Sequence, residues 1–520
     1  MARSYDLTSG SIPQHLLRLA APLIMGNILQ QLYNTVDAFI LGRFAGELEF
    51  AAVGVAGSVM NLFLFMITGA CTGISVIFAQ LYGAGERERF RREHWLSLSC
   101  GLLVTLACSG LGFLLLSPLL QFIQTPSELK TFVSVYLTII LASLPAAFLY
   151  NLYGALLRAI GRANAALMAF AAAVTVNVAL DYCFVARFQL GIAGAAWATA
   201  ASQAISAVLC ILYLRRKAPE LIFARAYCRM DGELSKQTAH FSFVTALHQS
   251  SLYIGKLLVQ GAVNTGGTDM ISAYTATTRI EGFANSFGDS GSAATSVLVA
   301  QNRGAGKEER VKEPFRSSLF LMLAMSLIMY VSASTSVGFM LGTRSGAAFE
   351  NARDYLKLVA LFYTLCFTGN TFAGYFNGIG KVSVPFLGAT SHIALRVVLS
   401  WLLVGKMGPP PSRWQQASAG CWSTRCGPLS NGGWRKSRKQ QNVILCKHQK
   451  PRALRRAAFD KFCEVSPLIE MRGKEMTFLR KHEVFAHMGK PCRKRKTFVR
   501  DALCLLNFCK VKLFYNSSKW

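Results

Sequence analysis

The chain has 520 residues, of which 52% are hydrophobic and only 16% are charged. Soluble domains contain about 25% charged residues, so this composition excludes an ordinary soluble enzyme or binding domain. The net charge of +29 resembles that of a nucleic-acid-binding protein, but residues 409–520 hold most of it, with 25 Lys and Arg against 6 Asp and Glu. The rest of the chain therefore gives no reason to expect a nucleic-acid partner.

Apolar runs of about 20 residues, the length that crosses roughly 30 Å of hydrocarbon, recur along the chain. The first run is too long for a signal peptide and lacks a small-residue cleavage site. We therefore expect an all-α, polytopic protein of the cell (inner or plasma) membrane that contacts the lipid bilayer. The expected spans are residues 16–42, 52–80, 95–117, 132–157, 164–186, 190–214, 238–263, 270–300, 316–341, 355–378 and 383–405.

Basic residues gather in every second loop. The loops that follow the first, third and ninth expected spans contain acids, among them Glu47, Glu128 and Glu350. By the positive-inside rule, the amino terminus and the basic loops are expected on the cytoplasmic side. The basic loops contain Arg87, Arg89, Arg91, Arg92, Arg158, Arg162, Arg215, Arg216, Lys217, Arg303, Lys307, Arg310, Lys312 and Lys381.

The two halves of the chain repeat each other. The turn AQLYGAG at residues 79–85 recurs as AQNRGAG 221 residues later, and Asn151 matches Asn370 at a spacing of 219 residues. Each half should hold six spans, an even number, so the two repeats should keep the same orientation, with the substrate path between them. We expect two lobes related by an axis along the membrane normal. The expected boundaries are 1–214 for the amino-terminal lobe, 215–236 for a cytoplasmic linker and 237–408 for the carboxy-terminal lobe.

The repeat is broken at its end. A twelfth span matching residues 191–199 should follow Gly408, but residues 409–411 are three prolines, which stop a helix, and the sequence becomes basic. Residues 413–420 can be written CGC TGG CAA CAG GCA TCG GCT GGN, and reading from the third letter gives Leu-Ala-Thr-Gly-Ile-Gly-Trp, an apolar helix start. We therefore expect a frameshift near Gly408, a missing twelfth span and a disordered, out-of-frame tail over 409–520.

Polar side chains fall at bilayer depth in the first half. Asp37 lies in the first span, where a carboxylate costs about 2.5–3.5 kcal/mol. Asn177 and Asp181 are four residues apart, as are Thr199 and Gln203, so each pair shares one helix face. Carboxyl, amide and hydroxyl oxygens are ligands that a hard cation prefers, and a buried acid can also exchange a proton. We expect a site for H⁺ or Na⁺ here and no other cofactor or metal; the alternative is a set of interhelical hydrogen bonds.

The second half differs chemically, because the repeat places Arg396 opposite Asn177 and Ser400 opposite Asp181. We expect it to shape the substrate path. Aromatic and Met side chains there could contact hydrophobic cations, although packing and lipid contact are the alternatives, and Arg279 and Glu281 could form structural ion pairs with neighbouring helices. The candidate cavity residues are Gln30, Gln31, Asn34, Phe63, Phe65, Met66, Gln203, Lys256, Arg279, Glu281, Phe283 and Phe287.

The stretch from Leu16 to Gly46, the repeated AQxxGAG turns and the NVALD segment at 177–181 resemble the MATE (multidrug and toxic compound extrusion) family, most of all its DinF-like bacterial branch. The resemblance covers residues 10–408. It implies two six-helix lobes that open alternately, and an antiport in which a small organic, often cationic, compound leaves as H⁺ or Na⁺ enters. The lack of a twelfth span departs from the family. The ion site that the resemblance implies falls on Asp37, Asn177, Asp181 and Thr199.

Other classes remain open beside this one. A flippase for lipid-linked saccharides, from a related two-lobed fold, would carry more cationic residues in its central cavity. A polytopic transferase would need a metal-ligand cluster, a nucleophile elbow or a phosphate loop, and the loop sequences contain none of these. We therefore expect a monomeric transporter rather than an enzyme, or a non-functional product if the frameshift has abolished transport.

Overall fold

The computed structural model describes residues 7–403 except 124, 224–226, 229–230, 265–267, 342–344 and 346. Within these residues the chain is helical and has no β-strand, which confirms the all-α prediction. The predicted frameshift, the tail over 409–520 and the missing twelfth span lie outside the described residues.

The helices of the described chain follow one another with short connections. The first half contains α1 (Ile12–Phe44), α2 (Glu47–Gly83), α3 (Arg87–Leu114), α4 (Leu116–Phe122), α5 (Ser127–Ala159), α6 (Ala163–Asp181), the π-helical segment η1 (Tyr182–Arg187), α7 (Gly191–Lys217) and the 3₁₀ segment η2 (Pro219–Leu221). The second half contains α8 (Gly232–Asn264), α9 (Thr268–Gly304), α10 (Glu313–Leu341), α11 (Ala347–Gly378) and α12 (Ser383–Leu403).

The long helices lie where the apolar runs predict spans. Among the described residues, six helices are long and apolar enough to cross a membrane by length and composition: α2, α3, α5, α6 with η1, α7 and α10. For α1, α8, α9, α11 and α12 a transmembrane course remains a prediction. Two local features are absent from the sequence prediction, namely the short helix α4 and the π-helical continuation of α6.

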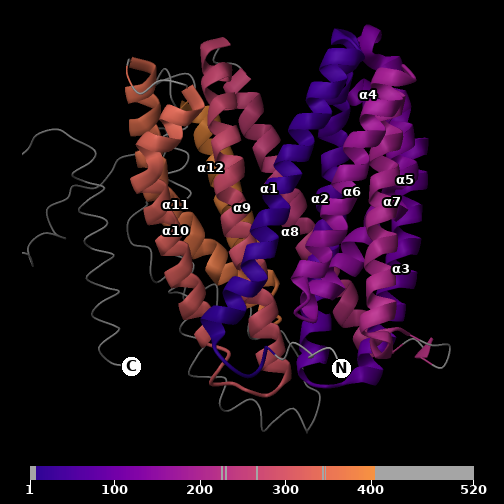
Figure 1. Cartoon of the computed structure of the whole chain (residues 1–520), viewed down its shortest axis with the longest axis vertical. Helices are drawn as coiled ribbons and strands as arrows, with labels where there is room; N and C mark the ends of the chain where they lie inside the picture. The colour runs from indigo at the N-terminus through magenta and orange to yellow at the C-terminus, as the bar shows by residue number, and fades with distance from the viewer. Residues whose placement is uncertain are drawn as a thin grey trace, which may run out of the picture. The chain divides into compact units, whose positions relative to one another are not determined.

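The helices form two bundles, α1–α7 of the first half and α8–α12 of the second half, and α1 and α8 lie near the middle, where the bundles meet (Figure 1). α1 packs against α6 of the first bundle and α9 of the second, and α8 packs against both α2 and α12. Pro22 lies inside α1 and Pro145 inside α5. Since proline removes a helix hydrogen bond, it marks a point where such a helix can bend. The predicted lobe boundaries remain predictions.

The internal repeat is visible in the ends of four described helices. Gly85 and Gly306 follow α2 and α9, while Gly161 and Gly380 follow α5 and α11, with φ of 73°, 70°, 78° and 76°. The residue after each glycine donates its N–H to the carbonyl oxygen five residues back, at 2.8–3.1 Å. Glycine is favoured there because side chains rarely tolerate this left-handed backbone. Repeat-related positions therefore adopt the same turn.

These turns lie at one end of the molecule, called the basic end below because the loops after α5, α9 and α11 and the start of α3 contain Arg and Lys. The two bundles touch there through repeat-related pairs. Gln80 Nε2 donates to the carbonyl oxygen of Gly378 at 3.0 Å, and Gln301 makes the corresponding bond to α5. A Cβ atom on Gly83 would overlap the backbone of Gln301, and one on Gly304 would overlap that of Gln80. The two bundles are therefore in close backbone contact at the basic end.

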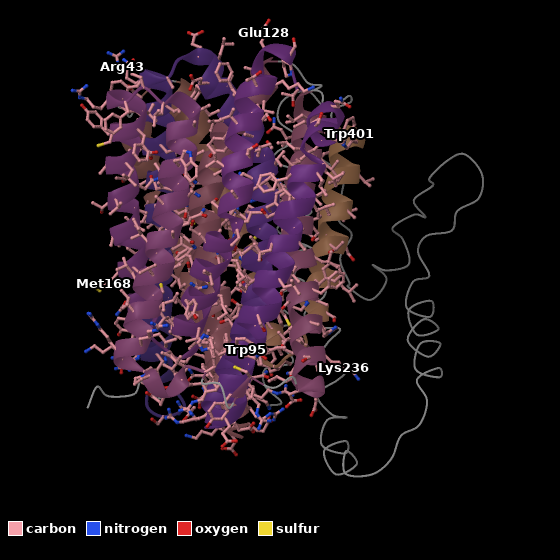
Figure 2. All side chains as sticks on the ribbon, turned by 90° about the vertical axis from the view of Figure 1, so that its right-hand side faces the viewer. Arg43, Trp95, Glu128, Met168, Lys236 and Trp401 are labelled. Carbon is pink, nitrogen blue, oxygen red and sulfur yellow. The ribbon has the colours of Figure 1, made fainter. Side chains whose placement is uncertain are left out.

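The opposite end holds the loops with acids. Arg43, near the end of α1, and Glu128, at the start of α5, lie at one end of the helices, whereas Trp95 and Lys236 lie toward the other (Figure 2). The alternation of loop charge along the sequence thus corresponds to the two ends of the bundle.

A buried acid links the bundles close to the basic end. Glu93 on α3 is fully buried, and its carboxyl oxygens accept hydrogen bonds from Ser97 Oγ at 2.6 Å and from Thr238 Oγ1 on α8 at 2.8 Å. A buried carboxyl is tolerated only when such donors satisfy it. Glu93 is therefore a structural contact between α3 and α8.

Replacing Glu93 with Ala is expected to destabilise the protein, because the hydroxyl of Thr238 loses its acceptor and a buried gap remains. We expect a loss of about 1–3 kcal/mol, seen as a lower midpoint of thermal unfolding in detergent. Glu88→Ala, which removes an exposed acid from the same helix, should leave the midpoint near that of the wild type. Equal midpoints for Glu93→Ala and the wild type would contradict the structural role.

Candidate functional site

Three helices of the first half of the chain bring four polar side chains to one place. α1 supplies Asp37, α6 supplies Asn177 and Asp181, and α7 supplies Thr199. Asn177 and Asp181 are 0% exposed and lie one turn apart on α6, as their spacing predicts. Asp37 is half-buried. The structure thus gathers all four residues to which the resemblance assigns an ion site, although their role in ion binding remains a prediction.

The carboxyl groups of Asp37 and Asp181 lie within hydrogen-bonding reach of each other. Two ionised carboxylates have no hydrogen to share, and neither oxygen of Asp181 has a hydrogen-bond donor among the described residues. A shared proton or a cation between the two groups would remove their repulsion and satisfy these oxygens. The pair is therefore suited to hold a small cation, including H⁺.

Asn177 completes this arrangement. Its side-chain nitrogen and oxygen are both buried and both lack a hydrogen-bond partner in the described part of the chain. Each buried polar atom left in this state costs about 1–3 kcal/mol. A ligand or ion that bonds to Asn177 and Asp181 together would recover that free energy, so the two residues are suited to bind one.

Two tyrosines that the sequence prediction missed border the acids. Tyr33 lies one turn before Asp37 on α1, and its phenol oxygen is 3.1 Å from Thr199 Oγ1. Tyr136 on α5 and Tyr33 both interact electrostatically with Asp37 and Asp181. The spacing of Tyr33 and Asp37 was a usable signal, because residues four apart share a helix face. The position of Tyr136 required the fold.

Directly after Asp181 the helix changes type. The segment η1 is π-helical, and the chain leaves it through bonds from Phe188 N–H to the Cys183 carbonyl at 2.8 Å and from Leu190 N–H to the Phe184 carbonyl at 2.9 Å. Such π turns are rare and recur at functional sites. Asp181 is thus the last residue of regular α-helix, at a point where the backbone is widened.

Thr199 also fits the alternative to an ion site, a set of interhelical hydrogen bonds, because it forms such a bond with Tyr33. Gln203, one turn further along α7, has a buried side-chain oxygen without a partner among the described residues. Gln30 donates to the side chain of Asn34 at 3.1 Å along α1. Gln31 lies opposite Gly282 of α9, so the polar face of α1 reaches the second bundle.

The apolar cavity candidates are mostly involved in packing. Phe65 stacks on Tyr253 of α8, with ring centroids 5.2 Å apart, while Phe63 and Phe287 pack against buried clusters of the first and second bundle. Met66 is half-buried on α2 and Lys256 is exposed on α8. The side chains of three further candidates lie outside the described part of the structure: Arg279, Glu281 and Phe283.

Tyr33→Phe is expected to weaken cation binding at the acid pair without removing it, because the phenol hydroxyl that contacts Thr199 is lost while both carboxyls remain. A neutral hydrogen bond of this kind contributes about 0.5–1.5 kcal/mol, so a two- to tenfold lower apparent affinity for the coupling ion is expected. Tyr253→Phe, which removes a phenol hydroxyl from α8, is the matched control. An unchanged ion affinity in Tyr33→Phe would show that the hydroxyl serves packing only.

Comparisons with known proteins agree with this architecture. The family model described as MatE matches two segments, residues 22–183 and 243–402, one in each half. The probable multidrug resistance protein YpnP of Bacillus subtilis is 25% identical over 408 residues, which cover 77% of this chain and 88% of YpnP. The probable multidrug resistance protein NorM of Thermotoga maritima is 23% identical over 390 residues, covering 72% and 82%. A solved outward-facing structure of a multidrug resistance MATE family transporter superposes with a TM-score of 0.75 at 18% identity, covering 84% of this chain and 98% of that one.

Proposed function

This chain belongs to the MATE family of multidrug transporters, and on that premise we propose that it is an antiporter that exports organic compounds in exchange for H⁺ or Na⁺. The observation that supports the ion coupling most directly is the Asp37–Asp181 pair, which joins two helices and leaves buried oxygens without donors among the described residues. Acids in such a setting are costly and mark ion pathways.

The position of α1 suggests how a cation and a substrate influence each other. Near its middle, Asn27 Nδ2 donates to Ser290 Oγ on α9 at 3.1 Å, so α1 is bonded to the second bundle. Further along, Asp37 meets Asp181 on α6 of the first bundle. A cation that draws the two carboxyls together acts on α1, and through α1 on the contact between the bundles. Both ligands then bias one two-state equilibrium, which is the requirement for exchange.

We further propose that the protein lies in the cell (inner or plasma) membrane as a monomer, with its amino terminus and basic end in the cytoplasm. The alternation of loop charge supports this orientation. In that orientation the close contact through Gly83 and Gly304 lies on the cytoplasmic side, which supports an assignment of this conformation to a state closed toward the cytoplasm.

The full chain in proteoliposomes tests this function. Ethidium, a fluorescent organic cation, is followed with an imposed pH gradient, with an imposed Na⁺ gradient and with neither. We expect one of the two gradients to accelerate ethidium export about fivefold or more, the lower end of common coupling energies. Equal rates under all three conditions would contradict the proposal, and acceleration by only one gradient would identify the coupling ion.

A further inference from the structure

The internal repeat relates the ion site of the first half to a place in the second half. α1 and α8 correspond at a spacing of 219 residues, which pairs Gln30 with Gln249 and Gly42 with Gly261. The same spacing puts Lys256 at the position of Asp37. Where the first bundle has an acid, the second therefore has a lysine.

The partner helix shows the same inversion. Gly161 and Gly380 form equivalent turns before α6 and α12. Asn177 lies sixteen residues after the first glycine, and Arg396 lies sixteen residues after the second. The position of the buried amide in the first bundle is therefore taken by a guanidinium in the second.

Lys256 lies on the face of α8 that looks toward the other bundle. Gln249, Tyr253 and Lys256 follow one another at helical spacing along this face. The Cβ of Gln249 abuts Gly69 of α2, and Tyr253 Oη donates to the carbonyl oxygen of Ser58 on α2 at 3.0 Å. Lys256 comes one turn beyond this contact and is exposed, so its ammonium group is accessible.

Arg396 lies on α12, the helix that packs against α8 next to Lys256. Gly255 of α8 is packed against Ile393 of α12, and Arg396 follows Ile393 by three residues on the same side of α12. The Nε of Arg396 and the Nε2 of His392 are buried and have no hydrogen-bond partner among the described residues. His392 and Arg396 also interact electrostatically. The guanidinium thus retains donor capacity that the described residues do not use.

Asp289 on α9 is the described acid that interacts electrostatically with Lys256. Counting only the described side chains, Asp289 balances the charge of Lys256 and the positive charge of Arg396 remains. Arg and Lys donors of this kind bind carboxylates and other oxyanions strongly, and Arg in particular binds them through two hydrogen bonds.

We propose that the second bundle contains an oxyanion-binding subsite, formed by Lys256 and Arg396, that holds the carboxylate of the exported compound while Asp289 is displaced from Lys256. This inference rests on the proposed export function and specifies its substrate class as organic compounds with a carboxylate, zwitterions included. The cation site of the first bundle and the anion subsite of the second are then opposite-charge versions of one repeated arrangement.

A matched pair of probes tests the subsite. Rhodamine 19 has a free carboxylate, and rhodamine 6G is its ethyl ester, so the two differ in this group alone. Binding of each to the full chain is measured by fluorescence polarisation in nanodiscs of phosphatidylcholine. We expect the wild type to prefer the acid over the ester about tenfold or more, the range for charge-assisted hydrogen bonds. We expect Lys256→Gln and Arg396→Gln to lose this preference and to keep their affinity for the ester.

Lys236→Gln, which removes an exposed lysine near the start of α8 (Figure 2), should keep the preference. Equal wild-type affinities for the two dyes would overturn the proposal, and so would variants that weaken both dyes equally, because that pattern indicates a structural role. Repeating the measurement with phosphatidylglycerol in the nanodiscs tests whether lipid phosphate groups, rather than the substrate carboxylate, occupy the subsite. Loss of the preference there would assign the subsite to lipid head groups and overturn the assignment to substrate. Gradient-driven export of the ester tests the transport function independently.

Discussion

Asp37→Asn is expected to abolish cation-driven export while membrane insertion stays intact. The amide has nearly the same size and keeps the half-buried place on α1, but it removes the negative charge that faces Asp181. A ligand shifts a two-state equilibrium only by its difference in affinity for the two states. Without the charge pair, a cation binds the two conformations with similar affinity. The coupling free energy of about 1–3 kcal/mol, equivalent to a 5–150-fold difference in affinity, is then lost.

The measurement is ethidium export from proteoliposomes under the effective gradient, together with the yield of folded protein in membranes. Glu128→Gln is the matched control, because it is also an acid-to-amide change and lies exposed at the start of α5. It should export at the wild-type rate. If Asp37→Asn responded to the gradient as well as the control does, Asp37 would have no part in ion coupling.

The course of the helices could be predicted from the sequence because a bilayer imposes one length scale on every span. Apolar runs therefore located α1 to α12 with α4 as the exception, although α3 and α11 begin eight residues before their predicted spans. α4 has only seven residues, too few for the periodicity of an apolar face to appear. The π-helical segment η1 was also beyond prediction, since its residues read as an ordinary continuation of α6.

The candidate site could be predicted only in part. The shared face of Asn177 and Asp181 follows from helical spacing alone, whereas the meeting of Asp37 with Asp181 depends on how α1 packs on α6, for which the sequence offered a family resemblance. Tyr136 was not recognisable as a neighbour of the acids, because its position depends on how α5 packs. Asp289 was overlooked, although an acid within an expected span is itself a signal.

The internal repeat also carries information about side-chain chemistry, beyond the two-bundle architecture that it predicts. Comparing chemistry at equivalent positions, instead of only identity, would have paired Asp37 with Lys256 from the sequence alone. What the sequence could not supply is that α8 and α12 are in contact at Gly255 and Ile393, which places Lys256 and Arg396 on neighbouring helices at one level.

Gly83→Val is expected to open the basic end. Gly83 on α2 lies against the backbone of Gln301 on α9, and its repeat partner Gly304 lies against the backbone of Gln80. Backbone cannot swing aside as the end of a flexible side chain can, so the added carbons must push the two helices apart. Overpacking of this kind costs about 1–3 kcal/mol, and the cost falls on the state in which the basic end is closed.

In the alternative conformation, with the basic end open, these backbones are apart. The substitution should therefore shift the population toward the open conformation by about tenfold or more, since 1.4 kcal/mol corresponds to a factor of ten. Spin labels at Glu88→Cys and Lys381→Cys, both exposed at the basic end, report the separation of the bundles by pulsed electron resonance. Gly54→Val is the control on the same helix, since a Cβ there meets open space, and it should leave the distance distribution unchanged. A distribution for Gly83→Val that matches this control would mean that the glycine contact does not hold the bundles together, and the seal would then have to come from the side-chain bonds of Gln80 and Gln301.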